Sequence, residues 1–264
     1  MGIKVFRRIA QISTLLLVSA IPLLNKEGIT VISGSLYSLS VDGIWITDPL
    51  SGFQVIISSF SADRILLLSM VIPVALALIF GRIFCGWICP QNFISELFDI
   101  IHDRLKVKRI FNPSPSAKPR YAIMILLLIS APLLGFPIAN LISAPGIISV
   151  QISKYFYEGI VGIELGLIGI IVISEVFIIR RGWCNYICPV GSFLGIFRFK
   201  RTMKVIYTED TEHTCGRCME CVTACQLGLN PMTGKIYPLC HNCGDCIDLC
   251  EKIKNTEKPL SFKF

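Results

Sequence analysis

The chain has 264 residues, of which 53% are hydrophobic and only 16% are charged, and its formal net charge is +7. A mean hydropathy of +0.66 lies well above the value for a soluble domain of this length, so the composition predicts a membrane protein. Membrane topology accounts for the excess positive charge, and no nucleic-acid partner is expected.

Four apolar stretches are long enough, or nearly so, to cross about 30 Å of hydrocarbon as helices. They run from Ile9 to Leu24, from Ile65 to Phe84, from Tyr121 to Leu141 and from Ile160 to Ile179. The first is short, but no small-residue cleavage site follows it, which argues against a signal peptide. The sequence therefore predicts an α-helical membrane protein whose residues 1–205 form four transmembrane helices in contact with membrane lipid.

The basic residues lie almost entirely on one side of these spans. Of the 25 lysines and arginines, all but Lys26, Arg64 and Lys154 precede the first span, join the second to the third, or follow the fourth. Because basic residues favour the cytoplasmic side, we expect both chain ends to be cytoplasmic. The predicted location is the cytoplasmic (inner) membrane, with several passes.

Two segments at the cytoplasmic ends of the second and fourth spans share the pattern C-x-x-x-C-P. They are residues 84–90, with Cys85 and Cys89, and residues 183–189, with Cys184 and Cys188. Each follows a basic span exit and precedes a short apolar-faced segment, so the unit of two helices and a motif occurs twice in one orientation. Parallel repeats are related by an axis along the membrane normal, which predicts two pseudo-symmetric hairpins with the motifs face to face.

These four cysteines are expected to form one shared site. Residues four apart share a helix face, so each motif presents two adjacent thiols. The four thiols are predicted to hold an additional iron–sulfur cluster or a metal. Two alternatives stay open: two dithiol/disulfide pairs, or small hydrophobic side chains buried for packing alone.

The last eight cysteines form two copies of the pattern C-x-x-C-x-x-C-x-x-x-C. In this pattern the first three thiolates bind one 4Fe–4S cluster and the fourth binds the neighbouring cluster. One cluster is therefore assigned to Cys215, Cys218, Cys221 and Cys250, and the other to Cys240, Cys243, Cys246 and Cys225. Residues 206–264 are predicted to form a cytoplasmic bacterial-ferredoxin-like α+β domain that moves single electrons.

Other readings of these eight cysteines fit less well. Disulfides are disfavoured in a reducing compartment, and structural zinc prefers two C-x-x-C pairs separated by a dozen or more residues. One departure from bacterial ferredoxins is that Gln226 and Glu251 stand where proline usually follows the fourth cysteine.

The remaining titratable residues exclude some chemistry. His102, His213 and His241 all lie outside the spans, so no haem held by two membrane histidines is expected. Nucleotide-binding loops are absent from the sequence, which disfavours transport driven by nucleotides. Glu175, near the end of the fourth span, is expected to pair with Arg180 or Arg181.

The four spans, the two C-x-x-x-C-P motifs and the double ferredoxin motif resemble the NapH-type ferredoxin-like membrane subunits of periplasmic nitrate reductase systems. Relatives in nitrous oxide and methylamine respiration are also similar, and the string from Gly34 to Leu50 looks like that family's first outer loop. The resemblance implies a quinol dehydrogenase subunit of anaerobic respiration. It would take electrons from menaquinol or ubiquinol and pass them, through iron–sulfur or cytochrome c subunits, towards a periplasmic reductase.

Two further expectations concern the position of the quinol pocket and an alternative function. The outer loop from Asn25 to Arg64 alternates apolar and polar residues and is a candidate for the quinol pocket. An alternative function is that of a membrane iron–sulfur assembly factor that reduces metals or thiols, since such proteins also carry C-x-x-x-C-P motifs.

Overall fold

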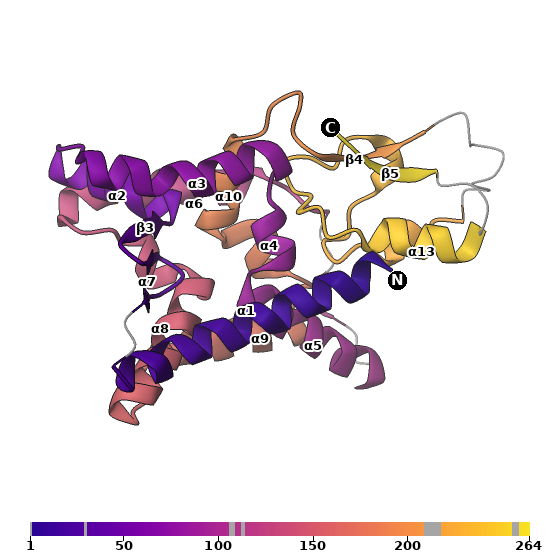
Figure 1. Ribbon diagram of the computed structural model, residues 1–264. Coiled ribbons are helices and arrows are strands. Elements are labelled where there is room, and N and C mark those ends of the chain that lie inside the picture. The colour runs from indigo at the N-terminus through magenta and orange to yellow at the C-terminus, as the bar shows by residue number, and fades with distance from the viewer. Residues whose placement is uncertain (1, 29–30, 106–108, 112–113, 209–217, 255–258) are drawn as a thin grey trace.

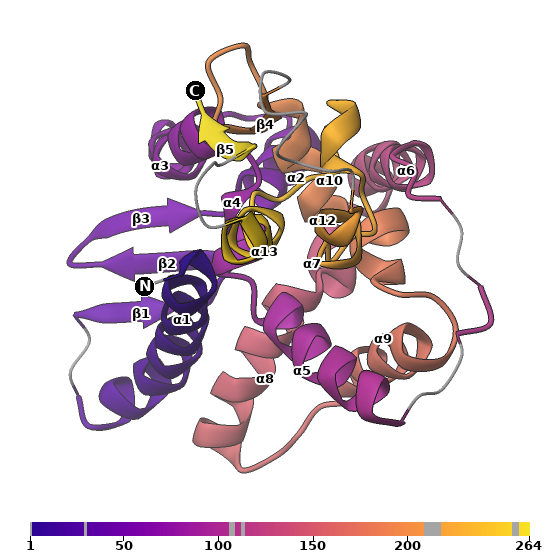
Figure 2. The ribbon, with the colours of Figure 1, turned by 90° about the vertical axis from the view of Figure 1, so that its right-hand side faces the viewer.

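A computed structural model describes residues 2–28, 31–105, 109–111, 114–208, 218–254 and 259–264. The helices of the chain form an elongated bundle, and the cysteine-rich tail covers one end of it (Figure 1). Seen from that end, α13 of the tail lies in front of the bundle, next to the start of α1 (Figure 2). Both chain ends lie at the tail end of the molecule.

The first repeat contains two long helices with a small sheet and a shorter helix between them. Its elements are α1 (Ile3–Lys26), β1 (Ile32–Gly34), β2 (Ser38–Val41), β3 (Ile44–Thr47), α2 (Pro49–Ser59), α3 (Arg64–Phe80), α4 (Ile83–Trp87) and α5 (Pro90–Leu105). The strands pair antiparallel in the order β1-β2-β3, with Ser38 opposite Thr47. Asp48 follows the sheet and caps α2, because its side chain accepts a hydrogen bond from the Ser51 amide at 3.0 Å.

The second repeat follows the same order, with a short helix in place of the sheet. Its elements are α6 (Lys118–Leu134), α7 (Ala139–Ile142), α8 (Ala144–Glu158), α9 (Leu165–Phe177), η1 (Trp183–Ile187) and α10 (Pro189–Ile196). The second motif forms a π-helical turn, η1, where the first motif forms the α-helical turn α4.

The two repeats exchange contacts reciprocally. Helix α1 packs against α8 of the second repeat, and α6 packs against α2 of the first. In the same way α5 contacts α8 while α10 contacts α2, and within the repeats α1 contacts α4 while α6 contacts η1. Such reciprocal contacts are those of two units related by a pseudo-twofold axis, in agreement with the arrangement predicted from the motifs.

The four predicted spans fall on α1, α3, α6 and α9. In the described part of the chain α1 alone is long and apolar enough to cross a membrane, while α3 and α9 are shorter apolar helices. The number of spans therefore stays a prediction. The first span was placed too late, since α1 begins at Ile3 rather than Ile9.

Helix α1 starts early because the tail caps it. Gly2 offers no side chain as a cap, and Asp248 of the tail accepts hydrogen bonds from the amides of Ile3 and Lys4 at 2.8 and 2.6 Å. A carboxylate at a helix N-terminus satisfies free amides and interacts favourably with the helix dipole.

The tail combines short helices with a two-stranded sheet. Its elements are β4 (Lys204–Tyr207), α12 (Glu220–Thr223), η3 (Pro231–Thr233), α13 (Asp245–Lys254) and β5 (Leu260–Lys263). Strands β4 and β5 pair antiparallel, with Val205 opposite Phe262. A small apolar core that includes Leu227, Ile236 and Ile247 holds these elements together. Because β4 crosses residue 205, the predicted domain boundary lies inside this strand, and the division into domains stays a prediction.

A buried arginine ties the tail to the bundle. Arg7 of α1 is fully buried, and its guanidinium lies 2.7 Å from Glu96 of α5 and 2.9 Å from Asp245 of α13. Three segments distant in sequence therefore share one desolvated ionic network, which neighbouring Arg8 joins from a more exposed position at 2.8 Å from Glu96.

Replacing Arg7 by methionine should loosen the tail. The change leaves Glu96 and Asp245 as largely buried charges, and losing one partner of a buried ion pair costs about 3–5 kcal/mol. The matched Arg8→Met change keeps the Arg7 contacts and should cost about 1 kcal/mol or less. Thermal unfolding and proteolysis of the tail in detergent check this, and equal effects of both variants would contradict it.

Candidate iron–sulfur site

The two C-x-x-x-C-P motifs have equivalent backbones. The amide of Cys89 donates to the carbonyl of Phe84 at 2.9 Å, and the amide of Cys188 donates to that of Trp183 at 2.8 Å. Both bonds span five residues, the π-helical spacing, so each motif closes in one wide turn. Proline then occupies the first position of α5 and of α10, where its missing N–H costs nothing.

The structure brings the four motif cysteines together. Cys89 interacts electrostatically with Cys85 of its own motif and with Cys188 of the other. Cys184 in turn interacts with Cys188 and Cys89. Within the described residues, no group of three or more His, Cys, Asp or Glu side chains is arranged to hold a metal ion.

Two buried arginines face these thiols without a carboxylate partner. Arg82 and Arg120 are 5% and 0% exposed, and among the ion pairs of the described residues neither takes part. Both interact electrostatically with Cys188, and Arg120 also with Cys85. Buried cations require compensating negative charge, so the environment suits thiolates or an anionic cluster better than neutral thiols.

The equivalent arginines of the two repeats reach across the pseudo-twofold axis. Arg181 donates to both the carbonyl and the side-chain oxygen of Asn92 at 3.1 Å. Arg82 lies against Gly191, the counterpart of Asn92, where an added Cβ would come within 2.5 Å of its Nη2. Arg181 is thus hydrogen-bonded just after the first motif, and Arg82 packs just after the second.

Asp99 of α5 pairs with the arginines that follow α9. Its Oδ2 lies 3.1 Å from Arg181 Nε and 3.9 Å from Arg180 Nε, and its Oδ1 lies 2.6 Å from Arg109 Nη2. Sequence reasoning missed Asp99, although an acid in the segment just after a basic span exit is a usable signal.

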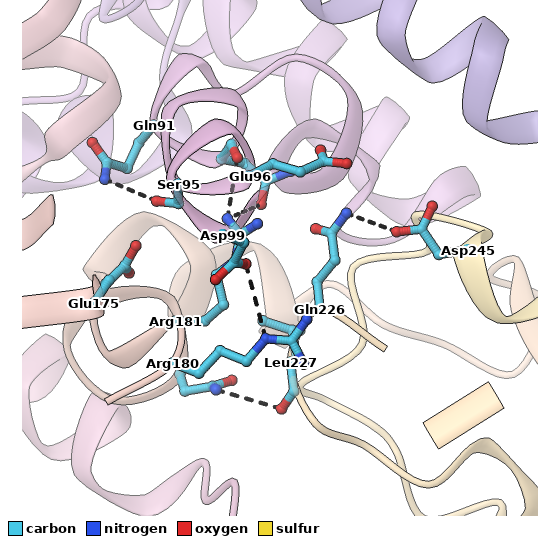
Figure 3. A network of polar contacts seen from close by, with 12 residues as sticks. Gln91, Ser95, Glu96, Asp99, Glu175, Arg180, Arg181, Gln226, Leu227 and Asp245 are labelled. Carbon is cyan, nitrogen blue, oxygen red and sulfur yellow. Dashed lines mark hydrogen bonds and ion pairs between the residues drawn. The ribbon is translucent and has the colours of Figure 1, made fainter. Parts of the chain in front are cut away.

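Among the described residues no direct ion pair joins Glu175 to Arg180 or Arg181, although Glu175 and Arg181 interact electrostatically at longer range. The chain turns sharply at Arg181, whose φ is 52°, and the arginine binds Asp99 of the neighbouring helix instead. Glu175 is buried, and neither of its carboxylate oxygens has a hydrogen-bond partner in the described structure. Figure 3 shows Glu175 apart from the bonded network around Asp99.

Three of the cysteines assigned to one tail cluster line a single cavity. Cys218, Cys221 and Cys250 surround it, from a loop, α12 and α13 respectively. The fourth predicted ligand, Cys215, lies outside the described residues. Thiolate sulfur is the donor that iron–sulfur clusters use, so the donor type suits the group assigned to this set, while the cavity itself measures only about 10 Å³.

The ligands predicted for the other tail cluster are Cys240, Cys243 and Cys246 of the second motif copy, with Cys225 of the first. Cys246 lies within electrostatic range of Cys240 and of Cys225, which belongs to the first copy of the motif, but also of Cys221, so the crossed assignment stays a prediction. Cys243 interacts with Cys240 in the same way. Burial raises the pKa of the Cys240 thiol to about 11 and also raises the pKa of Cys225. Burial thus disfavours free thiolates here, and bound cluster iron would stabilise them.

The second tail set lies against the membrane motifs. Arg82 donates to the carbonyl of Leu239 at 2.7 Å, and Trp87 of the first motif donates to that of Asn242 at 3.0 Å. Gly86 lies so close to the same loop that an added Cβ would come within 2.9 Å of the His241 carbonyl. The set around Cys240 is thus next to the motifs, whereas Cys218 of the other set is exposed.

Comparison with known proteins agrees with this architecture. A protein-family model described as a 4Fe-4S binding domain matches residues 65–108 and 159–205, which contain the two C-x-x-x-C-P motifs. The chain is 27% identical to the ferredoxin-type protein NapH of Escherichia coli, covering 85% of this chain and 79% of NapH. These similarities support a NapH-type ferredoxin protein.

Two further relatives extend this comparison. NapH of Haemophilus influenzae is 27% identical over 94% of this chain and 87% of its own length. The methylamine utilization ferredoxin-type protein MauN of Methylobacillus flagellatus is 26% identical over 68% of this chain and 61% of MauN. No solved structure matches the chain.

The comparisons confirm one part of the sequence-based function. The relatives and the 4Fe-4S match support an iron–sulfur electron-transfer protein and do not favour the alternative of an assembly factor. They associate it with subunits of respiratory redox complexes. The individual ligand sets stay predictions, because the family match does not assign them.

The crossed assignment of ligands can be tested with serine variants. Cys225→Ser should alter the same 4Fe–4S signal as Cys243→Ser, because both thiols belong to the set beside the membrane motifs. Cys221→Ser should alter the other signal and serves as the matched variant from the first motif copy. Electron paramagnetic resonance with iron analysis distinguishes them, and a shared signal for Cys225→Ser and Cys221→Ser would contradict the crossing.

Proposed function

We propose that this protein takes electrons from menaquinol or ubiquinol in the cytoplasmic membrane and passes them towards a periplasmic respiratory reductase. The observation that carries the proposal is the position of the Cys240 set directly against the bundle motifs, through Arg82 and Trp87. Redox sites in the bundle and in the tail thereby lie next to one another. Bound iron–sulfur clusters would supply one-electron exchange, which suits the stepwise oxidation of a two-electron quinol.

The surface of the bundle supports four membrane spans. Leu68 of α3, Leu126 of α6 and Ile170 of α9 are 70%, 65% and 65% exposed, and many neighbouring apolar side chains are exposed as well. Water-soluble monomers rarely expose contiguous apolar surface of this kind. Lipid around α1, α3, α6 and α9 would cover it, with both chain ends on the cytoplasmic side as the basic residues predict.

The four motif cysteines are proposed to hold a third iron–sulfur cluster. Support comes from the mutual proximity of the thiols, from the unpaired guanidinium groups of Arg82 and Arg120 beside them, and from the family model that matches these segments. A cluster bound by four thiolates is anionic, so it would compensate the two buried cations.

The arrangement implies an order in which electrons would pass through the three cysteine sites. The motif cysteines come first, the Cys240 set lies directly against the motifs, and the Cys218 set lies on the far side of the tail. Cys218 and Met219 are both exposed, so this far side offers the surface on which an iron–sulfur or cytochrome c partner would accept electrons.

Replacing Cys188 by serine should remove the bundle site alone. Iron content should fall by roughly one cluster in three, as four-thiolate ligation requires, while both tail signals stay intact. Cys250→Ser is the matched control, since it should change a tail signal and leave the bundle site. Loss of both tail signals in Cys188→Ser, or no loss of iron, would contradict the assignment.

The order of the sites predicts which variants a quinol can still reduce. In lipid without oxygen, menadiol should reduce the tail sites of the wild-type protein. Cys221→Ser should leave the Cys240 set reducible by menadiol. Cys243→Ser should prevent menadiol, but not dithionite, from reducing the Cys218 set, because the intermediate site is missing.

Electron paramagnetic resonance after rapid freezing measures both variants. Failure of any quinol to reduce the wild-type sites would reject the quinol function. Normal reduction by menadiol in Cys243→Ser would reject the order while leaving the function intact.

A further inference from the structure

A large cavity lies between α1 and α3, on the first-repeat side of the bundle. Its volume is about 390 Å³, within the range of about 300–1,000 Å³ that small-molecule pockets occupy. The outer strands close it on one side and the first C-x-x-x-C-P motif on the other. It belongs to neither of the cysteine sites in the tail.

The walls of the cavity are apolar and adjoin the lipid-facing surface. Val18 of α1 and Ala77 of α3 are buried in its lining, while Leu17 and Leu76 of the same helices also line it and are each nearly half exposed, so the cavity is open between the two helices. A hydrophobic molecule in the membrane would therefore reach the cavity between these two helices without crossing water.

One carboxylate stands out among these apolar walls. Asp48, at the start of α2, lines the cavity, and its Oδ2 accepts hydrogen bonds from the amide and hydroxyl of Ser51 at 3.0 and 2.9 Å. These bonds fix its position. Burial raises the pKa of the Asp48 carboxyl, which makes it a better proton acceptor than an exposed aspartate.

The inner end of the cavity reaches the first motif. Phe84 and Ile88 line it, and these residues immediately precede Cys85 and Cys89. A molecule in the cavity would be separated from the proposed redox site by this turn of backbone alone.

The outer end of the cavity adjoins a more polar space. A second cavity of about 430 Å³ shares Ile21, Gly34 and Ser35 with the first, and Lys154 and Glu158 line its far side. A proton accepted at Asp48 thus has a polar outlet on the side opposite the tail.

We propose that the cavity between α1 and α3 is the quinol site, with the Asp48 carboxylate accepting the hydrogen bond of a quinol hydroxyl. The proposal rests on the proposed function and adds the place and the proton acceptor. Oxidation of one quinol to the quinone releases two electrons, which pass singly to the one-electron iron–sulfur sites. It also releases two protons, which leave through Asp48 and the outer cavity.

A lipid acyl chain is the rival occupant, and the carboxylate argues against it. An acyl chain offers no hydrogen-bond donor to Asp48, whereas a quinol hydroxyl would add a donor to a carboxylate that already accepts two hydrogen bonds from Ser51. A quinol headgroup combines an apolar ring with hydroxyl donors and therefore matches both the walls and the single polar group.

Two matched pairs of variants test the site. Thr14→Phe places a ring into the cavity from α1, whereas Ile12→Phe places the same ring on the exposed face of α1, since Ile12 is 46% exposed. Asp48→Asn keeps a capping residue for α2 but removes the charge, whereas Asp63→Asn changes an exposed aspartate before α3.

The probe is the fluorescent quinol analogue 2-heptyl-4-hydroxyquinoline N-oxide, titrated into the full chain in lipid nanodiscs. We expect Thr14→Phe and Asp48→Asn each to weaken binding by about tenfold or more, the effect of losing room or a charge-assisted hydrogen bond. Ile12→Phe and Asp63→Asn should bind as the wild type does. Retained tail iron–sulfur signals show that each variant has folded.

The outcomes separate this proposal from the function on which it rests. If the wild type binds the analogue and Thr14→Phe binds equally well, the cavity is not the site, although the quinol function stands. If Thr14→Phe weakens binding but Asp48→Asn binds the analogue as tightly as the wild type, the cavity is the site and the role of Asp48 is rejected. If phospholipid stays in the cavity at saturating analogue and is lost in Thr14→Phe, the occupant is lipid. If the wild type binds no analogue and menadiol reduces none of its iron–sulfur sites, both proposals fail.

Discussion

The guanidinium of Arg82 lies where the three redox segments of the chain meet. It donates to the carbonyls of Pro238 and Leu239, just before the Cys240 set, and it lies against Gly191, just after the second bundle motif. A buried cation without a carboxylate partner is costly, and carbonyl dipoles offset part of this cost. Anionic clusters on both sides would offset more, so the packing of the tail onto the bundle and the charge of the redox sites depend on one another.

The pseudo-twofold axis explains why the motifs converge, and its imperfections explain why the two sides differ. Both repeats place a helix, a shorter helix and a second helix before the motif. Only the first repeat inserts a sheet, β1–β3, before its short helix, and this insertion closes the cavity that ends at Asp48. Where the first repeat has this sheet, the second repeat has the four-residue helix α7. The symmetric pair of repeats therefore supplies the four thiols, while the apolar cavity between α1 and α3 is closed by a sheet that the described part of the second repeat lacks.

The sequence predicted the features that depend on local pattern. Hydrophobic length placed α1, α3, α6 and α9, and identical motif spacing predicted that Cys85 and Cys188 come together. The features that it did not predict depend on partners distant in sequence. The start of α1 is determined by Asp248 of the tail, and Arg181 binds Asp99 rather than the nearby Glu175. The position of Asp48 inside the bundle depends on the packing of α2 against α6, which no local pattern shows.

Burial in a medium of low dielectric would separate electrons from protons in the proposed quinol reaction. Moving a charge through the bundle is expensive unless neutralising groups lie along its path. The cysteines and the arginines beside them form such a path towards the tail, where Arg7, Arg82 and Arg120 are buried. Asp48, Ser35 and the Lys154–Glu158 side of the outer cavity form a polar path in the opposite direction. Because the cavity lies between Asp48 and the first motif, a quinol bound there would release its electrons and its protons towards opposite ends of the molecule.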